Sequence, residues 1–132
     1  ESGYMIAHVT AAALASENKT LSHPASVDNI TTSAGQEDFV SMAPWAGQKL
    51  LNIQKNIFNI ISIELIIAGA ANYFNSLKMK SGKGTDSIIR LLNKTCDYKS
   101  GDRSLTKEIE SMRAIVKDGT ICNIVSKSLN LE

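Results

Sequence analysis

IFNIISIELIIAGAANYF, residues 57–74, is the stretch of this sequence that decides the fold. Drawn as a helix, it carries apolar side chains around its whole circumference: Ile57, Phe58, Ile60, Ile61, Ile63, Leu65, Ile66, Ile67, Ala68, Ala70, Ala71, Tyr73 and Phe74. A helix that is apolar on every side indicates burial on every side. The chain has 132 residues, too few for its other helices to surround this one. We therefore expect other chains, or another part of a longer protein, to cover the rest of it.

The same stretch is not expected to cross a membrane. Asn59, Ser62, Glu64 and Asn72 interrupt it, and its unbroken apolar runs are far shorter than the ~20 residues that a span needs. Glu64 is informative in a second way, because a carboxylate among isoleucines is costly unless it is paired. We expect its partner to be an Arg or Lys on another subunit.

The remainder of the sequence predicts an all-α protein, a bundle built around one long helix. Aromatic residues make up only 5% of the chain, and most of its 43% apolar content is Ala, Ile and Leu, which favours helix packing over a β-sandwich. Helices are expected over residues 4–18, 45–77, 86–96, 104–117 and 120–128. Irregular segments are expected at 20–32 and 79–84, with a helical turn at 33–39.

Short polar residues and glycine mark the expected starts of these helices. Ser2 or Gly3 can cap the first helix, and Thr85 and Ser104 can cap two later ones. Pro44 fits the first turn of the long helix or kinks it. The first helix is amphipathic, and its apolar stripe consists of Met5, Ile6, Val9, Ala12, Ala13 and Leu14.

Charge and cysteine content exclude several functions. The net charge is +1 without a basic stripe, so no nucleic-acid partner is expected. Cys96 and Cys122 form no CxxC pair, and two isolated thiols fit a reducing compartment such as the cytoplasm. A metal site needs three or four ligands at suitable spacing, and His8 and His23 lack such partners, so none is expected. The chain opens with Glu1 and no Met, and we expect it to be a piece of a longer protein.

A second stretch, LSHPASVDNITTSAGQEDFVSMAPWAGQKL at residues 21–50, carries a family resemblance. Together with TAAALASENKT just before it, this stretch strongly resembles the C-terminal part of the histidine ammonia-lyases, which belong to the aromatic amino acid ammonia-lyase family. The resemblance is dense from Ser2 to about Asn72 and looser from there to Glu132. It implies the C-terminal part of that family's helical fold. Residues 1–78 would carry core helices and an active-site loop, and 79–132 a C-terminal helical segment of the same domain.

The centre of that stretch, Gln36-Glu37-Asp38, is the candidate site. On spacing alone, Ser33 and Glu37 can simply cap a helix start. The resemblance favours another role, because Glu37 matches the acid of the family's Gln-Glu-Asp-His motif, which lies near the substrate. It implies that Glu37 is catalytic, that Gln36 lines or supports the site, and that Asp38 is structural. An acid at this position favours histidine over phenylalanine, although Phe39 replaces the motif's usual His.

The resemblance also implies an activity that this chain cannot complete alone. Members of the family eliminate ammonia from L-histidine to give trans-urocanate, using a methylidene-imidazolone (MIO) group that forms from an internal Ala-Ser-Gly. No such tripeptide is present here, since Ala15-Ser16 precedes Glu17 and Ala25-Ser26 precedes Val27. The chain alone is therefore expected to be inactive.

The resemblance finally implies a homotetramer whose active sites collect residues from several subunits. Two alternatives remain open at this point. One is a lyase or aminomutase that acts on another aromatic amino acid, and the other is a non-enzymatic helical module for oligomerisation.

Overall fold

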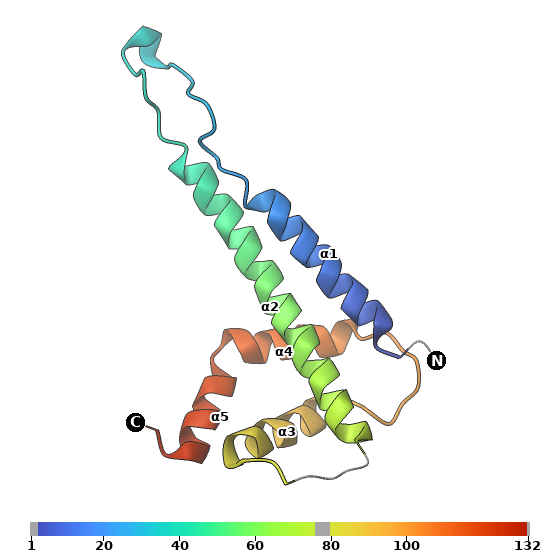
Figure 1. Cartoon of the computed structure of the whole chain (residues 1–132). Coiled ribbons are helices and arrows are strands. Elements are labelled where there is room, and N and C mark those ends of the chain that lie inside the picture. Colours follow the sequence, from blue (N-terminus) through green and yellow to red (C-terminus); the bar gives the residue numbers. More distant parts are fainter. Residues whose placement is uncertain (1–2, 76–79, 132) are drawn as a thin grey trace.

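The computed structural model describes residues 3–75 and 80–131, and within them it is all-helical, without a β-strand (Figure 1). This confirms the expected fold class. The elements, in chain order, are α1 (Met5–Leu21), the short 3₁₀ turn η1 (Ser33–Gly35), α2 (Ala43–Phe74), α3 (Lys83–Thr95), α4 (Thr106–Lys117) and α5 (Thr120–Leu129).

Helices α1 and α2 form a long antiparallel pair. Helices α3 and α4 pack against α2, and α5 packs on α3 and α4 (Figure 1). Polar side chains help to fix the pair. The buried Asn56 of α2 donates hydrogen bonds to the Glu17 carboxylate and to the Asn18 side-chain oxygen, both at 3.0 Å. Near the far end of the pair, the Lys49 ammonium donates to the main-chain carbonyl of His23.

The apolar stripe of α1 does not face α2. Met5, Ile6 and Val9 are 57%, 67% and 56% exposed, whereas the buried residue of the helix is Ala7. Residues spaced from Ala7 along the same helix face, such as Leu14, are the ones that are partly covered. Five of the six predicted stripe residues therefore lie on the outer surface of this chain, and Leu14 belongs to the partly covered face.

The core lies where α2 meets α3 and α4. Its buried members are Ile66, Ala70, Leu92, Cys96, Tyr98 and Met112. Gly69 of α2 allows the closest approach, because a Cβ atom at this position would lie 2.1 Å from the Tyr98 hydroxyl. The glycine therefore lets the segment after α3 pack directly on the backbone of α2.

Several predicted helix boundaries are wrong. Helix α1 continues to Leu21 and α2 begins at Ala43, with Pro44 in its first turn. Helix α2 ends at Phe74, because Asn75 has an extended backbone; residues 76 and 77 of the predicted continuation lie outside the described residues, as does a cap at Ser2. Helix α3 starts at Lys83 because the Gly82 carbonyl accepts the first helical bond, from Asp86 N–H at 2.8 Å.

The residues that precede α3 and α4 also differ from the predicted caps. Gly82, and not Thr85, precedes α3, and Leu105, and not Ser104, precedes α4. The Ser104 hydroxyl contacts the Thr106 hydroxyl at 3.1 Å and caps no backbone amide. Capping by side chains is thus absent at both helix starts.

The α2 circumference is only partly buried by this chain. Ile63 and Ile66 are 2% and 1% exposed, but Ile57, Ile61 and Phe74 are 43%, 37% and 66% exposed. Glu64 is exposed too, so within this chain it needs no ion-pair partner. By length and composition alone α2 could cross a membrane, which is weak evidence because core helices of soluble proteins pass the same test.

Candidate functional site

The connection between α1 and α2, residues 22–42, projects beyond the helix pair and away from α3, α4 and α5 (Figure 1). Its tip is a tight turn in which Ser33, Ala34 and Gly35 all have positive φ, at 52°, 53° and 88°. The predicted helical turn over 33–39 is therefore shorter than expected and ends at Gly35. No side chain caps it, so the interpretation of Ser33 and Glu37 as a helix cap is wrong.

Backbone hydrogen bonds fix Glu37 just after this turn. Thr32 N–H donates to the Glu37 carbonyl at 3.0 Å, and Glu37 N–H donates to the Thr32 carbonyl at 3.2 Å. This reciprocal pair is an isolated antiparallel bridge that closes the loop. Glu37 therefore occupies a defined backbone position at the end of a projecting hairpin.

A second contact closes the hairpin further from its tip. The Asn29 side-chain NH₂ donates to the Asp38 carbonyl, while its oxygen accepts from Val40 N–H at 3.0 Å. Asn29 was not among the residues predicted for the site. The available signal was its place in Asp28-Asn29, since both residue types form local hydrogen bonds to the backbone.

The three predicted site residues lie together but are not enclosed. Gln36, Glu37 and Asp38 are all exposed, and Phe39 is 89% exposed. A carboxylate and an amide on adjacent residues can accept and donate hydrogen bonds to a polar substrate. Since nothing in residues 3–75 and 80–131 covers them, they would form a closed site only together with surfaces from elsewhere.

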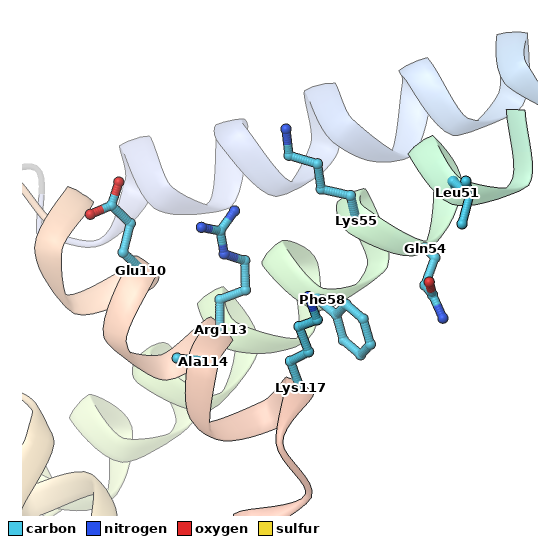
Figure 2. Close-up of a pocket in the computed structure, with 8 residues that line it drawn as sticks. All are labelled: Leu51, Gln54, Lys55, Phe58, Glu110, Arg113, Ala114 and Lys117. Carbon is cyan, nitrogen blue, oxygen red and sulfur yellow. The ribbon is translucent and has the colours of Figure 1, made fainter. Parts of the chain in front are cut away.

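A separate pocket of about 420 Å³ lies between α2 and α4. Figure 2 shows its residues, which are Leu51, Gln54, Lys55, Phe58, Glu110, Arg113, Ala114 and Lys117. Among the described residues, its three cations form no ion pair. The pocket lies on α2 apart from the hairpin. One sequence feature pointed to it, the i, i+4 spacing that places Arg113 and Lys117 on one face of their helix.

The environments of the cysteines and histidines do not indicate a second functional site. Burial raises the pKa of the Cys96 thiol, so this thiol is a poor nucleophile, whereas Cys122 is exposed. His8 and His23 are both exposed. In the described part of the chain, no three His, Cys, Asp or Glu side chains come together as metal ligands would.

Comparisons with known proteins agree on one family. The sequence matches the family described as aromatic amino acid lyase over residues 1–94. It is 41% identical over 128 residues to histidine ammonia-lyase from Bartonella henselae, covering 97% of this chain and 25% of that protein. Identity to histidine ammonia-lyase from Caldanaerobacter subterraneus subsp. tengcongensis is 44% over 126 residues, covering 96% and 25%.

A solved structure extends this similarity to the fold. The crystal structure of histidine ammonia-lyase from Trypanosoma cruzi matches with a TM-score of 0.87 at 34% identity, covering 97% of this chain and 25% of that one. The chain thus spans about a quarter of the length of these relatives.

Proposed function

The chain belongs to the aromatic amino acid lyase family, and from this premise we propose that it is the C-terminal portion of a histidine ammonia-lyase. The whole enzyme would eliminate ammonia from L-histidine to give trans-urocanate. The observation that supports this most strongly is the presentation of Gln36-Glu37-Asp38 on an ordered, projecting hairpin. Identities of 41% and 44% to histidine ammonia-lyases over nearly the whole chain support the same substrate.

Glu37 would be the catalytic residue that this chain contributes. A carboxylate can pair with the imidazole of bound histidine, orient it, or accept its proton. Gln36 would line or support the same site, and Asp38 would have a structural role; its main-chain carbonyl accepts a hydrogen bond from the Asn29 side chain. Phe39 beside them is apolar, so any substrate contact that it makes is dispersive and not a hydrogen bond.

The family's MIO group does not fit on this chain. The tripeptide from which it forms is absent, and the candidate site is an exposed hairpin that does not enclose a reactive group. The group would belong to a segment outside these 132 residues, where it would supply the electrophile. What this chain contributes is a carboxylate held at a fixed position and long helices for the core of the assembly.

We further propose a homotetramer in which the hairpin inserts into a site shared between subunits. The exposed Glu37 and the outward apolar stripe of α1 both support an assembly that covers them. In this proposal α2 is a core helix of that assembly and not a membrane span. The polar residues Asn56, Ser62 and Glu64 within α2 support this, as does the pairing of the buried Asn56 with α1. A cytoplasmic location and the division into residues 1–78 and 79–132 remain predictions.

The test is to express the full-length protein that contains these residues and to supply L-histidine, L-phenylalanine and L-tyrosine separately. Production of urocanate from histidine, followed by its ultraviolet absorbance, is the expected result. Elimination or amino-group migration on another aromatic amino acid would favour the alternative substrate, for which Phe39 is the one departure in the site. An assembled protein without activity on any of the three would favour the oligomerisation module.

The 132-residue chain itself should form no urocanate. Without an electrophile, the β-proton of histidine is too weakly acidic for a side-chain base to remove. Turnover by the pure chain, measured at high enzyme concentration with the full-length protein as a positive control, would contradict the proposed mechanism.

A further inference from the structure

The hairpin that presents Glu37 has almost no apolar packing to hold it. Residues 26–39 are all exposed, including Val27 and Ile30 at 80% and 64%. An irregular segment without buried side chains keeps one conformation only if specific hydrogen bonds fix it, because ordering each residue costs about 1–2 kcal/mol of backbone entropy. The source of order in this segment therefore has to be sought among its polar contacts.

Two sets of hydrogen bonds cross the hairpin. The Thr32–Glu37 bridge ties the tip through two backbone bonds. The Asn29 side chain ties the next part through both ends of its amide, to the Asp38 carbonyl and to Val40 N–H. Glu37 takes part in the first set, and the second set holds the Asp38 carbonyl and the Val40 N–H. The segment that carries Glu37 is therefore fixed at this residue and on its C-terminal side.

We infer that Asn29 is a positioning residue, which acts on the proposed reaction by fixing the backbone on the C-terminal side of Glu37. This rests on the proposed function, since it assumes that the Glu37 carboxylate contacts substrate. Asn29 is suited to the task because a primary amide has a donor and an acceptor at the distance that separates a carbonyl from an N–H two residues on. No other described side chain bridges the two arms of the hairpin.

This role predicts a loss of rate without a loss of fold. Removing the amide leaves the Asp38 carbonyl and the Val40 N–H exposed, and water can satisfy both. The helices should therefore melt as before, whereas the Glu37 segment gains freedom. Misplacement of a catalytic group by about 1 Å can cost ~10²-fold in rate. We expect at least about a tenfold decrease in kcat/KM for histidine in Asn29→Ala.

The two bonds can be separated by substitution in the full-length enzyme. Asn29→Asp keeps the acceptor for Val40 N–H but replaces the donor to the Asp38 carbonyl with a repelling oxygen, whereas Asn29→Ala removes both. The matched control is Ser26→Ala, an exposed residue of the same arm that makes no hydrogen bond among the described residues. Melting temperature and tetramer content are measured beside the kinetics for each variant.

A double-mutant cycle with Glu37→Gln then distinguishes positioning from general loosening. If Asn29 acts through Glu37, Asn29→Ala should cost at least tenfold in the wild-type background and little in the Glu37→Gln background. Equal losses in both backgrounds, or kinetics like those of Ser26→Ala, would overturn the inference. An inactive wild-type protein would instead refute the proposed function. In that case hydrogen exchange of the Val40 amide in the 132-residue chain still tests the hydrogen bond to Asn29. If the bond forms, the Val40 amide should exchange faster in Asn29→Ala than in the unmodified chain.

Discussion

At the scale of single residues, Glu37 shows how a charge can serve function without serving the fold. It is exposed, it caps no helix, and its backbone alone makes the bridge to Thr32. Because Glu37→Gln keeps that backbone, we expect a nearly unchanged melting temperature in the full-length enzyme. The amide loses the charge and the basicity, so kcat/KM for histidine should fall by ~10²-fold or more.

The control for this substitution is a second substrate. Any measurable turnover of phenylalanine, which has no imidazole, should fall much less than turnover of histidine. Near-normal histidine kinetics in Glu37→Gln would remove this residue from the catalytic machinery. A large fall in melting temperature would show that its side chain stabilises the fold, contrary to its exposure here.

Cys96 gives a pH-dependent prediction at the same scale. Burial raises the pKa of its thiol above the ordinary value of 9.0, and burial also raises the pKa of the neighbouring Tyr98 hydroxyl. Both groups bind their protons more tightly when folded than when unfolded. Their contribution to the unfolding free energy is therefore constant below about pH 9 and falls as the pH rises above it. Urea titrations of the chain at pH 8 and pH 10 check this. Cys96→Ala should reduce the fall, and Cys122→Ser, at an exposed thiol, should leave it unchanged.

At the scale of elements, the contact between Gly69 and Tyr98 fixes how the segment after α3 docks on α2. A Cβ at position 69 would lie 2.1 Å from the Tyr98 hydroxyl oxygen and 2.8 Å from its ring carbon Cζ. Gly69→Ala should therefore destabilise the chain by about 1–3 kcal/mol, the usual range for overpacking. Gly47→Ala on the same helix is the matched control, because a Cβ there meets nothing within 4 Å.

The control should change stability in the opposite direction. Replacing glycine within an open helix face stabilises it by about 0.5–1 kcal/mol. Chemical denaturation of both variants measures the difference, and Gly69→Ala with a stability equal to or above that of Gly47→Ala would refute the contact.

The elements also show what the sequence could and could not predict. The 57–74 stretch and the helical patterns around it gave the fold class and the number of long helices, because apolar periodicity depends on local sequence. The helix starts at Lys83 and Thr106 were not predicted. No polar side chain caps either helix, and the backbone conformation at Gly82 and Leu105 determines where each begins. The left-handed turn at Ser33 and Ala34 was missed for a related reason, since these residues rarely adopt positive φ.

The candidate site was predicted only in part. The resemblance predicted Gln36, Glu37 and Asp38 as site residues, and the structure places them together and exposed, directly after the turn at residues 33–35. Asn29 was not found, because its contacts join positions 9 and 11 residues apart across an irregular loop. The pocket between α2 and α4 was not found either, because it depends on how two helices cross, which local pattern does not determine.

At the scale of the whole molecule, the exposed apolar surface is the main property to explain. Met5, Ile6 and Val9 form one stripe on α1 with Ala12 and Ala13, and all five are exposed. On α2, the exposed apolar residues include Trp45, Leu50, Leu51, Ile57 and Ile61. Soluble monomers rarely expose contiguous apolar patches larger than a few hundred Å². The chain is therefore expected to self-associate, as subunits of the proposed tetramer would.

Sedimentation velocity over a range of concentrations tests this expectation. The chain should sediment as an oligomer, and Ile6→Gln combined with Val9→Gln should shift it toward monomer, because each glutamine removes apolar area from the stripe while keeping helix propensity. The control is Ala15→Gln, at an exposed position of the same helix to the side of the stripe, which should leave the oligomer intact. Circular dichroism should show the same helix content for all variants. If the unmodified chain stays a well-behaved monomer at high concentration, the stripe on α1 is tolerated in water. Another part of the enzyme, and not a second copy of this chain, would then have to cover the stripe.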